Sequence, residues 1–157
     1  MRVRAVVGLG ANLGDRLATM RSAAKELGQL ARLLATSRVY ETAPIGPPQG
    51  DFLNAAALLE CEERGLPALL EALLDLELRL GRVRAERWGP RAIDLDLLWA
   101  EGVVLESERL LLPHPRLAGR AFALLPLLEL VPGAKDPRTG EPYVVPFGEV
   151  RWTGETL

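Results

Sequence analysis

The chain has 157 residues, of which 25% are charged, and its formal net charge is −2. This length fits a single domain over residues 1–157, since a chain of this size can bury roughly two-thirds of its unfolded surface. The single cysteine excludes an internal disulfide, the apolar runs are too short to span a bilayer, and the net charge supplies no general attraction for nucleic acid. We therefore expect a cytoplasmic protein with no membrane or nucleic-acid partner. We also expect a monomer, although none of these features bears on the oligomeric state.

The first third of the chain predicts a strand, a helix and two further strands. Residues 2–9 are rich in valine and are closed by Gly8 and Gly10, which predicts a strand that ends in a turn. Asp15 suits a helix cap, and apolar residues then recur at helical spacing at Leu17, Met20, Ala24, Leu27, Ala31 and Leu34. Residues 36–42 and 52–61 predict strands, separated by a segment with three prolines and two glycines that excludes regular structure.

The remaining sequence predicts a second helix and further strands. Pro67 suits the first turn of a helix whose apolar pattern runs to Leu80, and Gly81 ends it. An arginine-rich loop follows, then strands at 93–99 and 103–105, a short helix at 122–130 and turns at 132–140. The order strand, helix, strand, strand, helix, strand predicts an α+β fold. We expect a ferredoxin-like βαββαβ core, in which two helices cover one face of an antiparallel sheet, with C-terminal additions.

Two acidic residues alternate with apolar ones in the strand predicted at 93–99. Side chains alternate between the two faces of a strand, so Asp94 and Asp96 share one face, about 6.5 to 7 Å apart along the chain. Like charges this close favour a cation between them, and magnesium is typically held by one or two carboxylates together with substrate phosphates. The simpler alternative is a strand with one solvated face.

Four arginines lie in the turn-rich segment before this strand, at Arg82, Arg84, Arg87 and Arg91. Guanidinium groups bind phosphate oxygens in bidentate fashion and keep their charge, so carboxylates next to arginines indicate phosphoryl-transfer chemistry. The alternative is a surface cluster in which these arginines pair with acids such as Glu86.

The segment from Arg87 to Leu98, RWGPRAIDLDLL, resembles the signature of the hydroxymethyldihydropterin pyrophosphokinase family. The likeness extends, in order and spacing, to residues 8–15, 40–46, 52–56, 81–84 and 112–115. It implies an enzyme of folate biosynthesis that transfers diphosphate from ATP to the hydroxymethyl group of 6-hydroxymethyl-7,8-dihydropterin and releases AMP.

The resemblance also implies roles for individual residues. It implies catalytic roles for Arg82, Arg91, Asp94 and Asp96, with the two aspartates binding two Mg²⁺ ions; contacts on the ATP side for Glu77, Arg84, Trp88, Arg109, His114 and Arg120; and pterin contacts for Thr42, Pro44, Ile45, Phe52, Asn54 and Phe122. Aromatic faces with a few fixed hydrogen bonds suit a flat polar heterocycle, which supports the last group in part. The alternative is that Phe52 and Phe122 are ordinary core residues and that Asn54 caps a strand end.

The sequence argues against two competing functions. A dinucleotide-binding oxidoreductase would need G-x-G-x-x-G, but the spacing from Gly8 to Gly14 is one residue longer. A nucleic-acid-binding module of ferredoxin-like fold without catalysis would need exposed aromatics and a basic face, whereas only 5% of the residues are aromatic.

Overall fold

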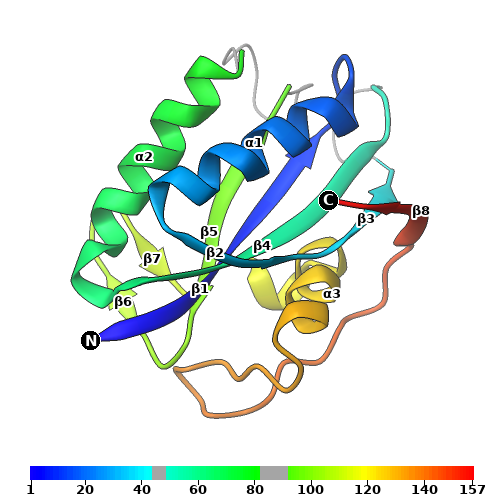
Figure 1. Ribbon diagram of the computed structural model, residues 1–157. Helices are drawn as coiled ribbons and strands as arrows, with labels where there is room; N and C mark the ends of the chain where they lie inside the picture. The colour runs from blue at the N-terminus through cyan, green and yellow to red at the C-terminus, as the bar shows by residue number, and fades with distance from the viewer. Residues whose placement is uncertain (44–48, 82–91) are drawn as a thin grey trace.

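The computed structural model describes residues 1–43, 49–81 and 92–157. Among these residues, a six-stranded sheet has the strand order β5-β1-β4-β3-β8, and β2 also pairs with β4 (Figure 1). The strands of this sheet are β1 (Arg2–Ala11), β2 (Arg32–Thr36), β3 (Arg38–Thr42), β4 (Phe52–Glu62), β5 (Asp94–Ala100) and β8 (Arg151–Thr156). A small sheet pairs β6 (Leu105–Glu106) with β7 (Leu111–Leu112). The helices are α1 (Arg16–Leu30), α2 (Leu66–Arg79) and α3 (Ala121–Leu130), with 3₁₀ turns at Glu63–Gly65 and Leu117–Gly119.

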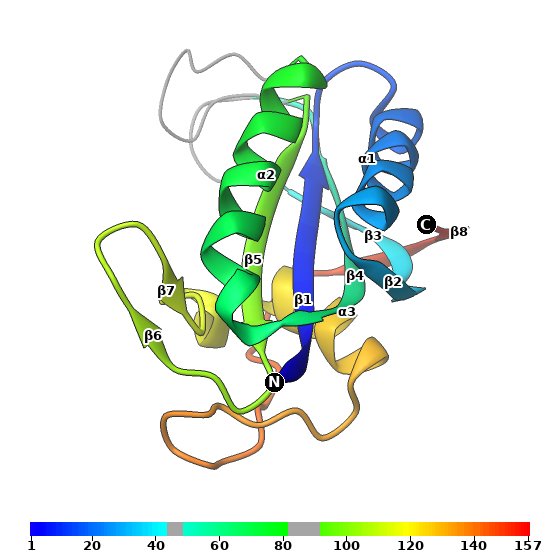
Figure 2. The same cartoon turned by 60° about the vertical axis from the view of Figure 1, so that its left-hand side comes forward.

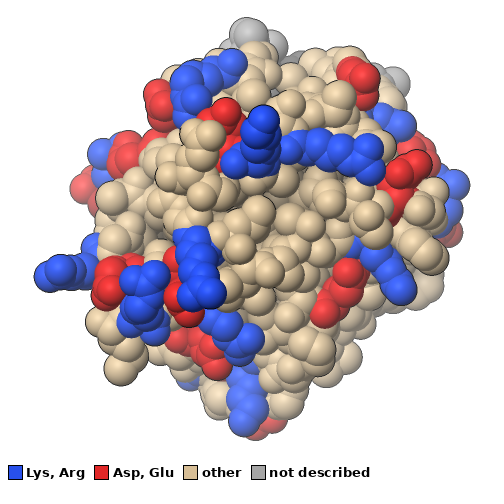
Figure 3. All heavy atoms as spheres, viewed as in Figure 1, with Lys and Arg blue, Asp and Glu red and all other residues tan. Residues whose placement is uncertain are grey.

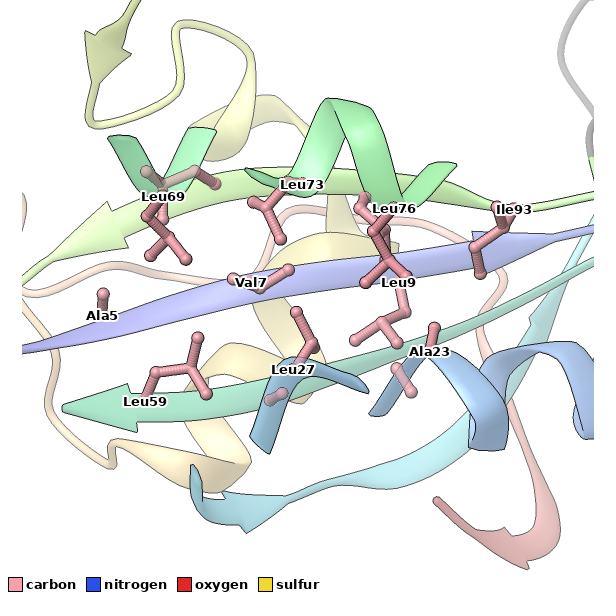
Figure 4. Packing of buried hydrophobic residues seen from close by; sticks show 14 of the residues in the cluster. Ala5, Val7, Leu9, Ala23, Leu27, Leu59, Leu69, Leu73, Leu76 and Ile93 are labelled. Carbon is pink, nitrogen blue, oxygen red and sulfur yellow. The ribbon is translucent and has the colours of Figure 1, made fainter. Parts of the chain in front are cut away.

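Helices cover both faces of the sheet. Helices α1 and α2 lie on one face and α3 lies on the other, which is clearest when Figures 1 and 2 are compared. Side chains along β1 alternate between the two faces of the sheet, so β1 contributes to a buried cluster on each face. Val7 and Leu9 pack in the cluster beneath α1 and α2, whereas Val6 packs in the cluster with α3. Figure 4 shows part of the first cluster, in which Leu27 of α1 and Leu73 of α2 both point toward Val7 of β1.

The predicted antiparallel sheet with helices is confirmed. Strand β1 pairs antiparallel with both β4 and β5, and β3 pairs antiparallel with β4. The helix expected to end at Gly81 has Pro67 in its first turn and is followed by that glycine at a φ of 95°. The expected short helix forms at Ala121–Leu130 with Pro126 inside it.

The first helix has the predicted start but a different end. The Asp15 side chain accepts a hydrogen bond of 3.2 Å from the Ala18 N–H, as a capping residue does. The apolar spacing predicted that the helix includes Ala31 and Leu34, and this was wrong. The helix ends at Leu30, and Ala31 is extended. Residues 32–36 instead pair with β4, which shows a tertiary pairing overriding a local helical pattern.

Three strand predictions were also wrong in detail. The strand predicted at 36–42 is divided at Ser37, whose buried hydroxyl accepts a 2.8 Å hydrogen bond from the Ala56 N–H. The first strand does not end in a turn at Gly8 and Gly10, but continues to Ala11 with both glycines paired to neighbouring strands. The strand expected at 103–105 is β6 at 105–106, and β8 was not predicted.

Charges on the surface are mixed in sign. On the face shown in Figure 3, basic and acidic side chains lie next to one another. Arg4 pairs with Glu101 at 2.7 Å, and Arg79 pairs with Asp75 at 3.0 Å. Within the described part of the chain, no helix has the length and apolar character needed to cross a membrane.

Leu73 offers a direct test of the core beneath α2. Its side chain is fully buried, so Leu73→Ala should lower the free energy of unfolding by about 2 to 5 kcal/mol through lost burial and a cavity. The matched control is Leu78→Ala on the same helix, where the side chain is 68% exposed and a change within about 0.5 kcal/mol is expected. Urea unfolding measures both, and equal losses in the two variants would contradict the packing described.

Candidate active site

A cavity of about 620 Å³ extends from α3, across the edge strand β5, to one side of α2. Ten of the residues implied by the family resemblance line it: Thr42, Phe52, Asn54, Glu77, Asp94, Asp96, Arg109, His114, Arg120 and Phe122. The other six, Pro44, Ile45, Arg82, Arg84, Trp88 and Arg91, lie outside the described residues. A second cavity of about 580 Å³, near the start of α1, contains none of the sixteen. The described candidates therefore converge on one place.

The two aspartates lie on the same side of β5, as the alternation predicted. Leu95 and Leu97 are buried in the core with α1 and α2, while Asp94 and Asp96 are half-buried and line the cavity. Opposite them on β1 stand two glycines, with Gly10 paired to Asp94 and Gly8 to Asp96. The carboxylates therefore flank a stretch of strand that carries no side chains on its cavity side.

This pair of carboxylates fits a hard divalent cation. Carboxylate oxygens suit magnesium, which is commonly bound by one or two such groups and by phosphate oxygens and water. In residues 1–43, 49–81 and 92–157, no group of three or more His, Cys, Asp or Glu could hold a metal ion. A metal bound by Asp94 and Asp96 would thus take its remaining ligands from a phosphate-bearing substrate, from water or from both.

Glu77 anchors the edge of the strand that carries the aspartates. Only 2% of this residue is exposed, and its Oε2 accepts a 2.8 Å hydrogen bond from the N–H of Leu95, the residue between Asp94 and Asp96. Strand β5 is the edge of the sheet, so its outward N–H groups need partners from outside the sheet. The carboxylate of Glu77, from α2, supplies one and connects that helix to the aspartate pair.

A polar and aromatic group lies on the adjacent strands. Asn54 is 6% exposed, and its Nδ2 donates a 2.8 Å hydrogen bond to the Thr42 hydroxyl on β3. Phe52 lies two residues away on the same strand, hence on the same face, and Phe122 approaches from α3. A ring bound here would meet aromatic faces and an amide whose orientation is already set.

The charges of Asp94, Arg116 and Arg120, which also line the cavity, act on the His114 side chain. Its Nδ1 accepts a 3.2 Å hydrogen bond from the Arg116 N–H, so this nitrogen carries no proton and the neutral ring has its hydrogen on Nε2. Burial lowers the pKa of His114, and the charges of Arg120 and Arg116 lower it further, while Asp94 opposes the shift. At neutral pH the ring is therefore an uncharged hydrogen-bond donor in the cavity.

Two arginines border the cavity differently. The Arg120 guanidinium lies 5.6 Å from the centre of the Phe122 ring, which is a cation–π distance. A candidate phosphate-binding residue, Arg120, is therefore next to a candidate ring-binding residue, Phe122. The Arg109 side chain is 72% exposed and forms an ion pair with Glu71 of α2. Arg109 thus lies at the rim and Arg120 beside the proposed ring position.

The residues that sequence reasoning missed are chiefly Gly8 and Gly10. The sequence pattern predicts a turn at these glycines, yet they lie within β1 and line the cavity. A signal was present, because glycines in the interior of a strand often mark a close approach of a ligand or another backbone. Arg116 and Leu98 also line the cavity, without any local pattern that would have singled them out.

Comparison with known proteins gives a consistent family. A sequence profile of the 7,8-dihydro-6-hydroxymethylpterin-pyrophosphokinase family matches residues 6–132. The chain is 41% identical over 142 residues to the 2-amino-4-hydroxy-6-hydroxymethyldihydropteridine pyrophosphokinase of Synechocystis sp., covering 89% of this chain and 72% of that protein. It is 46% identical over 132 residues to the enzyme of the same name from Methylorubrum extorquens, covering 82% and 83%. For the Bacillus subtilis enzyme the identity is 42% over 129 residues, covering 80% and 77%.

Solved structures give the same fold at low sequence identity. A crystal structure of an HPPK-DHPS in complex with substrates matches with a TM-score of 0.68 and 15% identity, covering 90% of this chain. The Plasmodium falciparum HPPK-DHPS A437G with SDX-DHP matches with a TM-score of 0.63 and 14% identity, covering 91%. The chain spans less than half of these longer proteins, 42% and 44% respectively.

Proposed function

The chain belongs to the 7,8-dihydro-6-hydroxymethylpterin-pyrophosphokinase family, and from that membership we propose how its cavity carries out the transfer. The enzyme is a pyrophosphokinase of folate biosynthesis. We propose that it takes ATP as the diphosphate donor, takes 6-hydroxymethyl-7,8-dihydropterin as the acceptor, releases AMP and requires two Mg²⁺ ions.

One observation carries this proposal: the carboxylate pair and the ring-binding group line the same cavity. Asp94 and Asp96 lie on β5, whereas Asn54 and Phe52 lie on β4. A single strand, β1, lies between β5 and β4. A substrate held at Asn54 can thus present an oxygen toward phosphates held at the aspartates. Such placement suits phosphoryl transfer, which depends mainly on positioning and charge neutralisation.

We assign the following roles to the described residues. Asp94 and Asp96 would bind magnesium, which when bound neutralises phosphate charge and lowers the pKa of a nearby alcohol. Asn54 would orient the pterin through its amide, and the side chains of Phe52 and Phe122 would hold the ring by stacking. His114 would donate from Nε2 to a phosphate oxygen, since Nδ1 is already engaged by the backbone.

Arginines complete the phosphate-binding part of the proposal. Arg120 lies beside Phe122 and would neutralise phosphate charge next to the acceptor, while Arg109 at the rim would contact the nucleotide. Glu77 would act by holding β5 at Leu95, in addition to lining the nucleotide side of the cavity. Arg82, Arg84, Trp88 and Arg91, with Pro44 and Ile45, keep the roles that the resemblance implies.

We also propose a fold type and a compartment. The unit β1–α1–β3–β4–α2–β5, with antiparallel strands in the order β5-β1-β4-β3, supports a ferredoxin-like core to which α3 and β8 are added. The single cysteine supports a cytoplasmic setting. We propose that the protein acts as a monomer.

The decisive experiment separates products of a reaction with ATP and hydroxymethyldihydropterin by chromatography. We expect AMP and a diphosphorylated pterin in equal amounts, no AMP when the pterin is omitted, and loss of turnover when EDTA removes divalent cations. Formation of ADP in place of AMP would contradict the proposed transfer. Salt-sensitive RNA retention without turnover would instead favour the nucleic-acid-binding alternative.

A further inference from the structure

Gly8 and Gly10 occupy the same side of β1 but meet different surroundings. A Cβ atom added at Gly8 would lie 2.9 Å from Cδ1 of Leu98, a side chain only 2% exposed. An alanine at position 8 would therefore force the Leu98 side chain to shift within its buried cluster. The packing of Leu98 thus gives a structural reason for Gly8.

The fold gives no such reason for Gly10. A Cβ atom there would meet the Asn54 Oδ1 at 3.6 Å, the Leu53 carbonyl oxygen at 3.7 Å and the Phe52 Cδ1 at 3.8 Å, which are ordinary van der Waals distances. Gly10 is not among the glycines with positive φ, so its backbone suits any residue. Because glycine is unfavourable inside a strand, alanine would suit the fold at least as well.

The position of Gly10 relates it to both proposed substrate groups. It pairs with Asn54 of β4 on one side and with Asp94 of β5 on the other, so the three residues form a row across three strands. Two strand spacings, about 9 to 10 Å, separate the outer members of this row. That span matches a bicyclic ring with a one-carbon arm, whose polar edge meets the amide and whose alcohol is directed to the carboxylate.

We propose that Gly10 is a specificity-determining residue, whose missing side chain leaves the space in which the pterin ring lies between Phe52, Asn54 and Asp94. This inference rests on the proposed function. A methyl group at position 10 would project beside Phe52 and Asn54 without disturbing either, and it would occupy volume that the ring needs. The glycine therefore serves binding of the acceptor rather than folding.

The test compares Gly10→Ala with two other glycine variants. Gly10→Ala should keep or raise the Tm, raise the KM for hydroxymethyldihydropterin by more than about tenfold, and change the KM for ATP by less than about twofold. Gly28→Ala in α1, where a Cβ would meet Leu33 at 3.8 Å, is the control with neither KM changed. Gly8→Ala should instead lower the Tm, because of its contact with Leu98.

Each outcome is decisive for the inference. An unchanged KM for the pterin in Gly10→Ala would overturn it, and so would a fall in Tm like that of Gly8→Ala, since the glycine would then serve packing. The wild-type reaction is measured alongside: its absence would refute the proposed function, whereas normal wild-type turnover with an unaltered Gly10→Ala would refute only the role of Gly10.

Discussion

Replacement of Asp94 or Asp96 by alanine is expected to lower kcat/KM on the order of a thousandfold, while the protein stays folded. Each substitution removes a carboxylate that faces the cavity, so charge neutralisation at the phosphates is lost. Both side chains are half-buried and project away from the core formed by Leu95 and Leu97, so the free energy of unfolding should change by less than about 1 kcal/mol. Steady-state kinetics with saturating magnesium and urea unfolding measure the two effects separately.

Asp75→Ala is the matched control for these variants. Its side chain is 68% exposed on α2 and pairs with Arg79 at 3.0 Å, four residues along the helix. Exposed ion pairs of this kind contribute little to the free energy of unfolding, so the stability should remain close to wild type. Turnover should also remain close to wild type, because Asp75 does not line the cavity. Near-normal activity of Asp94→Ala and Asp96→Ala with magnesium would remove the basis of the metal site.

Asn54→Ala is expected to raise the KM for hydroxymethyldihydropterin by roughly one to two orders of magnitude, because an unmatched polar edge of the ring costs about 1 to 3 kcal/mol. The amide is 6% exposed and is oriented by its bond to Thr42, so water cannot easily replace it. The KM for ATP should change little, since the aspartates lie two strands away. Isothermal titration with the pterin alone would report the same loss as a weaker Kd.

Tyr40→Phe provides the comparison for Asn54→Ala. Tyr40 is the cross-strand partner of Asn54 and is also buried, and its hydroxyl donates a 2.7 Å hydrogen bond to Glu129 of α3 outside the cavity lining. Its loss should cost about 1 kcal/mol of stability and leave the pterin KM unchanged. If the two variants altered the KM equally, Asn54 would be acting through the packing of β3 and β4 rather than by contact with the ring.

Features with a strong local signal were predicted well. The alternation of Asp94, Leu95, Asp96 and Leu97 indicated which side chains share a face, and the structure agrees. Helix α2 followed from Pro67 and its apolar spacing, because capping and amphipathic periodicity act within a few residues. The start of α1 at Asp15 was predicted on the same grounds.

Features that depend on a distant partner were missed. Leu34 fits a helical spacing, but residues 32–36 form β2 because β4 supplies a strand to pair with. Strand β8 is exposed along its length and carries no apolar alternation, and it is defined by its pairing with β3. Gly8 and Gly10 resemble a turn when they are viewed without β4 and β5 on either side.

The local sequence alone determined that two carboxylates project from one face of a strand, and that this strand follows an amphipathic helix, since both depend on periodicities of a few residues. Only the tertiary structure decided that Asn54, Gly10 and Asp94 form one row, and that Glu77 bonds to the N–H between the two aspartates. The register of pairing between strands far apart in the chain sets these neighbours, and a shift of one residue would turn each side chain to the opposite face.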